Sequence, residues 1–118
     1  MPVRGIRGAT VVAADEPEQI LEATKRLLED IITANDVDVD DIASIMFTMT
    51  PDLGSAYPAQ AARLLGWTDA PLLGAVETDV DGALPRCIRV LMHVNTGKPV
   101  SEITHVYLGK AATLRPDR

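Results

Sequence analysis

The chain has 118 residues, 47% of them hydrophobic and 24% charged, which predicts one globular domain over residues 1–118. Its formal net charge of −6 argues against a nucleic-acid surface, and no apolar run is long enough to span a membrane. No basic and apolar leader opens the sequence, and the single cysteine, Cys87, excludes an internal disulfide and fits a cytoplasmic protein.

A strand and a long amphipathic helix are predicted first. The strand covers residues 3–12. The helix starts at a capping signal, in which Asp15 caps, Pro17 suits the first turn and Glu18 completes the capping-box spacing. Asn35 is expected to stop the helix in a left-handed conformation. The apolar stripe of this helix follows the helical period through Ile20, Leu21, Thr24, Leu27, Leu28, Ile31 and Ile32.

The middle of the chain predicts shorter elements. A turn of helix is expected at residues 38–41 and a second strand at residues 45–49. Pro58 at a helix start and Gly66 just past its end bracket a short helix that carries Arg63.

Three more strands are predicted in the second half, at residues 72–77, 85–94 and 103–108. The first two are separated by an Asp81-Gly82 turn signal. The tail from about residue 112 has no periodicity and is expected to be mobile. Five strands and two main helices indicate an α+β fold, with a mixed five-stranded sheet and the helices on one face. A second copy of so small a chain could cover the other face, which motivates an oligomer hypothesis.

Two arginines, Arg7 and Arg89, lie in the middle of predicted strands. Residues two apart share a face of a strand, so both guanidinium groups are expected on mostly apolar faces. A desolvated guanidinium needs a partner, either a protein carboxylate or an anionic ligand. Spacing alone favours a structural ion pair with Glu77 or Asp79.

Seven short motifs follow one another along nearly the whole chain. They are Arg4–Thr10, Thr50–Leu53, Pro58-Ala59, Gly66-Trp67, Cys87–Val90, His105–Leu108 and Leu114–Asp117. In this order they resemble the monofunctional AroH-type chorismate mutases. The resemblance implies a homotrimer with a pseudo α/β-barrel core and active sites in clefts between neighbouring subunits. It implies conversion of chorismate to prephenate, on the route to phenylalanine and tyrosine, without a cofactor or metal.

The resemblance also implies roles for individual residues. Arg7 and Tyr107 match the pair that holds a substrate carboxylate. Arg89 matches the arginine facing the breaking ether oxygen, and Glu77 matches the carboxylate that accepts from the ring hydroxyl. Substrate-binding positions around the cleft are implied for Tyr57, Ala59, Arg63, Leu72, Leu73, Gly74, Leu114 and Arg115. The chain departs from the family pattern at Gln60, often lysine, and at Gly74, often cysteine, which affects affinity more than reaction type.

This reaction is a unimolecular rearrangement that needs no nucleophile and no proton transfer. The enzyme must hold a compact conformer of a dianion and stabilise charge that builds on the ether oxygen. A rigid guanidinium suits both tasks, because its donors form a fixed fork. His105 is expected to be an exposed strand residue rather than a base, and Trp67 a packing anchor.

Two other function classes are considered. A non-catalytic trimeric sensor that binds an aromatic carboxylic acid would keep Arg7 and Arg115 but would need no arginine at an ether oxygen. A small trimeric enzyme acting on imines or enamines would have to position a water molecule, and the sequence shows no obvious means. Arg89, Glu77 and Tyr107 together count against the sensor.

Overall fold

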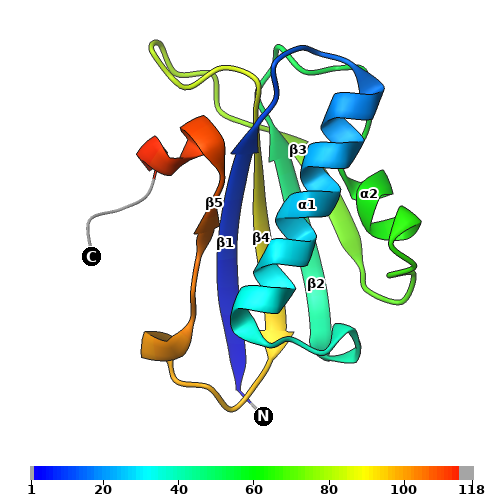
Figure 1. Ribbon diagram of the computed structural model, residues 1–118, viewed down its shortest axis with the longest axis vertical. Coiled ribbons are helices and arrows are strands. Elements are labelled where there is room, and N and C mark those ends of the chain that lie inside the picture. The colour runs from blue at the N-terminus through cyan, green and yellow to red at the C-terminus, as the bar shows by residue number, and fades with distance from the viewer. Residues whose placement is uncertain (1, 115–118) are drawn as a thin grey trace.

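The computed structural model describes residues 2–114 of the chain. Within this range the sheet has the strand order β3-β2-β4-β1-β5, and Figure 1 shows α1 lying along it with α2 beside α1. The strands and α-helices are β1 (Val3–Val11), α1 (Pro17–Asn35), β2 (Ile42–Met49), α2 (Ala59–Leu64), β3 (Leu72–Val76), β4 (Cys87–Asn95) and β5 (Val106–Tyr107). Short 3-10 helices are η1 (Val39–Asp41), η2 (Val100–Glu102) and η3 (Gly109–Leu114).

β4 forms the centre of the sheet. It pairs antiparallel with both β1 and β2, while the outer strands β5 and β3 join those two in parallel. The mixed sheet predicted from the sequence is therefore confirmed. The even-numbered residues of β4 from 88 to 94 are buried, so Arg89 and Leu91 point to the opposite face.

α1 covers one face of the sheet, and the core lies between the two. Leu27, Leu28 and Ile31 of this helix are fully buried and belong to one cluster with Phe47 of β2. The helix approaches β1 so closely that a Cβ added at Gly8 would lie 2.7 Å from Ile31 Cδ1. Each large aliphatic side chain buried here contributes about 1.5–3 kcal/mol, so this layer supplies much of the stability of the fold.

The opposite face of the sheet has little cover within residues 2–114. Ala111 of η3 packs at one end of it, in a small apolar cluster with Ala9 and Cys87. The helices therefore lie mainly on one face, as predicted. We call the uncovered side the open face; it carries Arg7, Met46, Thr48, Arg89 and Leu91.

The ends of α1 differ from the sequence prediction. Its N-cap is Glu16, whose side chain makes no capping hydrogen bond. Asp15, which was predicted to cap the helix, does not do so, because its carboxylate accepts from the backbone N–H groups of Gly54 and Ser55, both at 3.0 Å. The left-handed residue at the other end is Asp36, with φ 52°, and Asn35 is the buried last residue of the helix. No helix in the described part of the chain is long and apolar enough to cross a membrane.

The last strand is shorter than predicted. Only Val106 and Tyr107 pair with β1, whereas residues 103–108 were expected to form a strand. Side chains hold the preceding segment instead: Asn35 binds both backbone groups of Thr104, and His105 accepts from the backbone of Arg7. A backbone satisfied by side chains has no need of ladder hydrogen bonds.

The segment after β5 turns into η3. Its Ala111 is fully buried, and Leu114 is half-buried against the same cluster. Residues 115–118, and with them Arg115, lie outside the described residues. The mobility of the tail therefore stays a prediction.

Candidate active site

The strand register brings three of the predicted catalytic residues close together on the open face. Ala9 of β1 pairs with Arg89 on one side and with Tyr107 on the other. Paired residues point to the same face, so Arg89 and Tyr107 flank Ala9. Arg7, two residues before Ala9, follows on the same face of β1.

These side chains surround a cavity of about 260 Å³, the catalytic cavity. Glu77 joins them, because its backbone N–H donates to Met49 O at 2.7 Å and so extends the β3 edge by one residue. The four residues with predicted catalytic roles thus share one cavity. Their roles remain predictions. The full lining is Arg7, Gly8, Met46, Thr48, Glu77, Arg89, Val90, Leu91 and Tyr107.

Arg89 forms an ion pair with Glu77, and the distance from Nη1 to Oε1 is 3.0 Å. The Arg89 side chain is 48% exposed and that of Glu77 is 25% exposed. The expectation of a desolvated Arg89 is therefore wrong for the single chain, because the open face lacks a covering layer there. Such a solvated pair contributes only about 0.2–1 kcal/mol, so an incoming anion can compete for the guanidinium.

Tyr107 is held in place by hydrogen bonds to β1 from the residues just after and just before its short strand. On one side, Leu108 N–H donates to Ala9 O at 2.9 Å. On the other, the backbone N–H of Arg7 donates to His105 Nδ1 at 3.0 Å. His105 is half-buried and ties β1 to β5, so its predicted role as an exposed strand residue is wrong.

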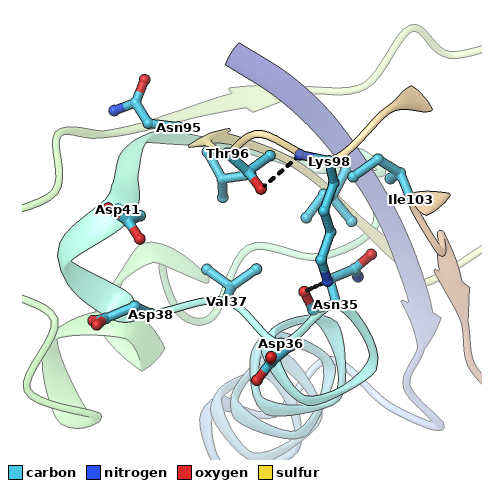
Figure 2. Close-up of a pocket in the computed structure, with 11 residues that line it drawn as sticks. Asn35, Asp36, Val37, Asp38, Asp41, Asn95, Thr96, Lys98 and Ile103 are labelled. Atoms are coloured by element: carbon cyan, nitrogen blue, oxygen red, sulfur yellow. Dashed lines mark hydrogen bonds between the residues drawn. The ribbon is translucent and has the colours of Figure 1, made fainter. Parts of the chain in front are cut away.

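A second anchor of β5 comes from the buried end of α1. Asn35 Oδ1 accepts from Thr104 N–H at 2.7 Å, and its Nδ2 donates to Thr104 O at 2.8 Å and to Ile31 O at 2.9 Å. Figure 2 shows Lys98 reaching from the loop after β4 to Asn35, whose backbone carbonyl accepts from Lys98 Nζ. A cation at this carbonyl also complements the helix dipole. The end of α1 thereby fixes the segment that leads to Tyr107.

Cys87 lies beside Arg89 on β4 but is not a reactive group. Its side chain is 3% exposed, and burial raises the pKa of the thiol, with Arg89 opposing the rise. A protonated thiol is a poor nucleophile. Cys87 is therefore a core residue of the small apolar cluster that includes Ala9 and Ala111.

Six of the eight predicted binding residues gather at a different place, the β3 edge. They line a cavity of about 400 Å³, the edge cavity, together with Phe47, Met49, Pro58, Ala75 and Val76. Apolar side chains here are unusually open to solvent: Tyr57 is 76% and Leu73 60% exposed. The members that were predicted to bind substrate are Tyr57, Ala59, Arg63, Leu72, Leu73 and Gly74.

The edge cavity and the catalytic cavity share no lining residue. Leu114 belongs to neither, since it packs on the apolar cluster at the end of the open face. A Cβ added at Gly74 would meet no heavy atom within 4 Å, so packing inside the chain does not require glycine there. Gln60 is exposed on α2.

The sequence did not point to Thr48, Met46 or Leu91 as cavity residues. Apolar and hydroxyl side chains in strands have no distinctive spacing, and only the register of β2 against β4 places them beside Arg89. Within residues 2–114, no group of three or more histidine, cysteine or carboxylate side chains is arranged to hold a metal ion.

Comparison with known proteins gives consistent matches over nearly the full length. Residues 3–118 match the family "Chorismate mutase type I". "Chorismate mutase AroH" of Bacillus subtilis is 48% identical, over 99% of this chain and 93% of that protein. The Thermus thermophilus protein of the same name is 50% identical, over 98% and 95%. A chorismate mutase structure from Clostridium thermocellum superposes with a TM-score of 0.92 at 47% identity, covering 93% of this chain and 98% of that one. The chain therefore belongs to the chorismate mutase type I family.

Proposed function

We propose that this chorismate mutase converts chorismate to prephenate by conformer selection and arginine stabilisation of the ether oxygen. The observation that carries the mechanism is the catalytic cavity, where two guanidinium groups, one carboxylate and one phenol line a single space on the open face. No nucleophile is required, and the buried thiol of Cys87 supplies none.

Each polar group has a task in this mechanism. Arg7 and Tyr107 come from adjacent strands and hold one carboxylate of the substrate. Glu77 accepts a hydrogen bond from the ring hydroxyl. Arg89 donates to the ether oxygen, where negative charge grows as the carbon–oxygen bond breaks. A well-placed donor to such a charge lowers the barrier by roughly 2.7–4 kcal/mol.

The site is completed in a homotrimer, in clefts between neighbouring subunits. The edge cavity of one subunit covers the catalytic cavity of the next, bringing Tyr57, Arg63 and Leu73 to the substrate. Two features of the chain support this arrangement. The open face lacks cover, and β3 is an edge strand with exposed apolar side chains, a surface that natural proteins normally bury against a partner.

The cellular role that follows is aromatic amino-acid biosynthesis in the cytoplasm, with chorismate as substrate and no cofactor. The sensor alternative uses the same anion-binding arginines but predicts binding without turnover. The enzyme class that acts on imines or enamines predicts no loss of chorismate.

Turnover is tested by following the loss of chorismate absorbance with purified protein and identifying prephenate by its acid conversion to phenylpyruvate. We expect catalysis without added metal, and equal rates after treatment with a chelator. Binding of chorismate without turnover would favour the sensor. An unchanged chorismate signal with no binding would contradict both.

A further inference from the structure

The Thr48 hydroxyl is a polar group that the catalytic cavity leaves unused. Its Oγ1 is fully buried and has no hydrogen-bond partner among the described residues. Thr48 lines the catalytic cavity together with Glu77 and Arg89. An unsatisfied buried hydroxyl costs about 1–3 kcal/mol, so its presence in a site calls for a function.

The strand register places Thr48 between the two partners of the ion pair. Thr48 of β2 pairs with Arg89 of β4 on one side and with Ala75 of β3 on the other. Glu77 is two residues beyond Ala75 and points to the same face. Figure 1 shows β2 running between β3 and β4. The Arg89–Glu77 pair must therefore reach across β2, over strands spaced about 4.8 Å apart, beside Thr48.

Thr50, just past the end of β2, is a nearby threonine whose hydroxyl is fully hydrogen-bonded. Its Oγ1 donates to Asp52 Oδ1 at 2.5 Å and accepts from Cys87 N–H at 3.0 Å. Thr50 is thus a structural threonine with both roles filled. Thr48 has neither, although it is only two residues away.

We propose that Thr48 is a positioning residue for Glu77, a role that rests on the proposed function. When the carboxylate and ether oxygen of the bound substrate together draw the Arg89 guanidinium away, Glu77 loses its ion-pair partner. The Thr48 hydroxyl then donates to the Glu77 carboxylate and holds it toward the ring hydroxyl of the substrate. A hydrogen bond to a charged acceptor is about twice as strong as one between neutral groups, so it offsets part of the broken ion pair.

The variants Thr48→Val, Thr48→Ser and Thr50→Val separate this role from a structural one. Valine keeps the shape of threonine and removes only the hydroxyl. We expect Thr48→Val to keep or raise the melting temperature, because no hydrogen bond of the resting protein is lost, and to raise KM roughly tenfold. Thr48→Ser keeps a hydroxyl, so its KM should lie close to the wild-type value. Thr50→Val should lower the melting temperature, because it breaks two hydrogen bonds.

A double variant tests whether Thr48 acts through Glu77. In a Glu77→Ala background there is no carboxylate to position, so adding Thr48→Val should change prephenate affinity, measured by calorimetry, by less than about twofold. The proposal would be overturned if Thr48→Val left KM unchanged or lowered the melting temperature as Thr50→Val does. It would also be overturned if adding Thr48→Val to Glu77→Ala changed prephenate affinity by much more than twofold. If the wild-type protein did not convert chorismate, the proposed function would be wrong as well. If the wild type turned over chorismate and Thr48→Val had the same KM, only the role of Thr48 would be wrong.

Discussion

In the proposed mechanism, Arg89 has two competing partners, the Glu77 carboxylate and the ether oxygen of the substrate. The ion pair is half open to solvent and contributes little to folding. The ether oxygen is a weak partner until charge develops on it in the transition state. An interaction made chiefly in the transition state appears in turnover rather than in binding.

Arg89→Ala should therefore lower kcat by on the order of a thousandfold, with a loss of at most about 1 kcal/mol in the free energy of unfolding. Arg89→Lys keeps the charge without the fork, so it should recover only part of the rate. Steady-state kinetics and urea unfolding on the same preparations measure both quantities. Turnover of a folded Arg89→Ala protein within about tenfold of wild type would remove Arg89 from the mechanism.

At the scale of elements, β5 is the piece of the site least supported by its own hydrogen bonds. It has two residues, and the buried Asn35 at the end of α1 secures the segment before it. A helix thus controls the position of Tyr107 without touching the catalytic cavity.

Asn35→Ala should destabilise the fold by about 1–3 kcal/mol, since it removes the hydrogen bonds to both backbone groups of Thr104. It should also raise KM through a displaced Tyr107. The checks are urea unfolding and hydrogen exchange at the Leu108 amide, which bonds to β1. Wild-type protection at Leu108 in the variant would show that Asn35 does not anchor β5.

Asp15 is the corresponding anchor for the loop before α2. Hydrogen bonds from the Ser55 side chain, and from the backbone of Gly54 and Ser55, lower the pKa of its carboxyl. Because the folded pKa is below the ordinary value of about 3.9, the stabilisation is complete above that value and is lost as pH falls through the folded pKa. The loop should loosen only in strong acid.

The matching variant is Asp15→Asn, which keeps an acceptor oxygen but cannot ionise. We expect wild type to have the higher melting temperature at neutral pH, and this advantage to shrink as the pH is lowered from about 5 to 2.5. Thermal unfolding across that pH range measures the difference. An advantage that stays constant with pH would mean that the Asp15 charge does not hold the loop.

The sequence predicted most elements because their signals are local. Short strand-like runs predicted β2 and β4, and the apolar stripe predicted α1, whose Leu27 and Ile31 are buried as expected. Its ends were misassigned because Asp15 binds a distant loop and Asn35 binds Thr104, in the segment before β5. The gathering of Arg7, Arg89, Glu77 and Tyr107 came from family resemblance, since no local pattern states which strands are neighbours. Thr48 was missed for the same reason.

At the scale of the whole molecule, the exposed β3 edge is the surface through which the proposed trimer would assemble. Val76 is 72% exposed in the single chain and lines the edge cavity. Val76→Lys should weaken the trimer, because it would bury a charge in the contact. Val100, 65% exposed in η2 and outside both cavities, offers the matched control Val100→Lys.

Sedimentation equilibrium at micromolar concentration distinguishes these proteins. Wild type and Val100→Lys should be trimers, and Val76→Lys should dissociate and lose activity together. A wild-type monomer that still turns over chorismate would contradict the shared cleft.

The separation of the two cavities on one chain has a consequence for trimers assembled from two different variants. A subunit disabled at Arg89 still offers an intact edge, and one disabled at Arg63 still offers an intact open face. Two inactive variants should therefore complement each other when they are unfolded and refolded together. In a cyclic trimer, any mixed assembly regains one whole cleft, so an equal mixture should recover roughly a quarter of wild-type activity. Chains that carried both halves of the site themselves would recover none.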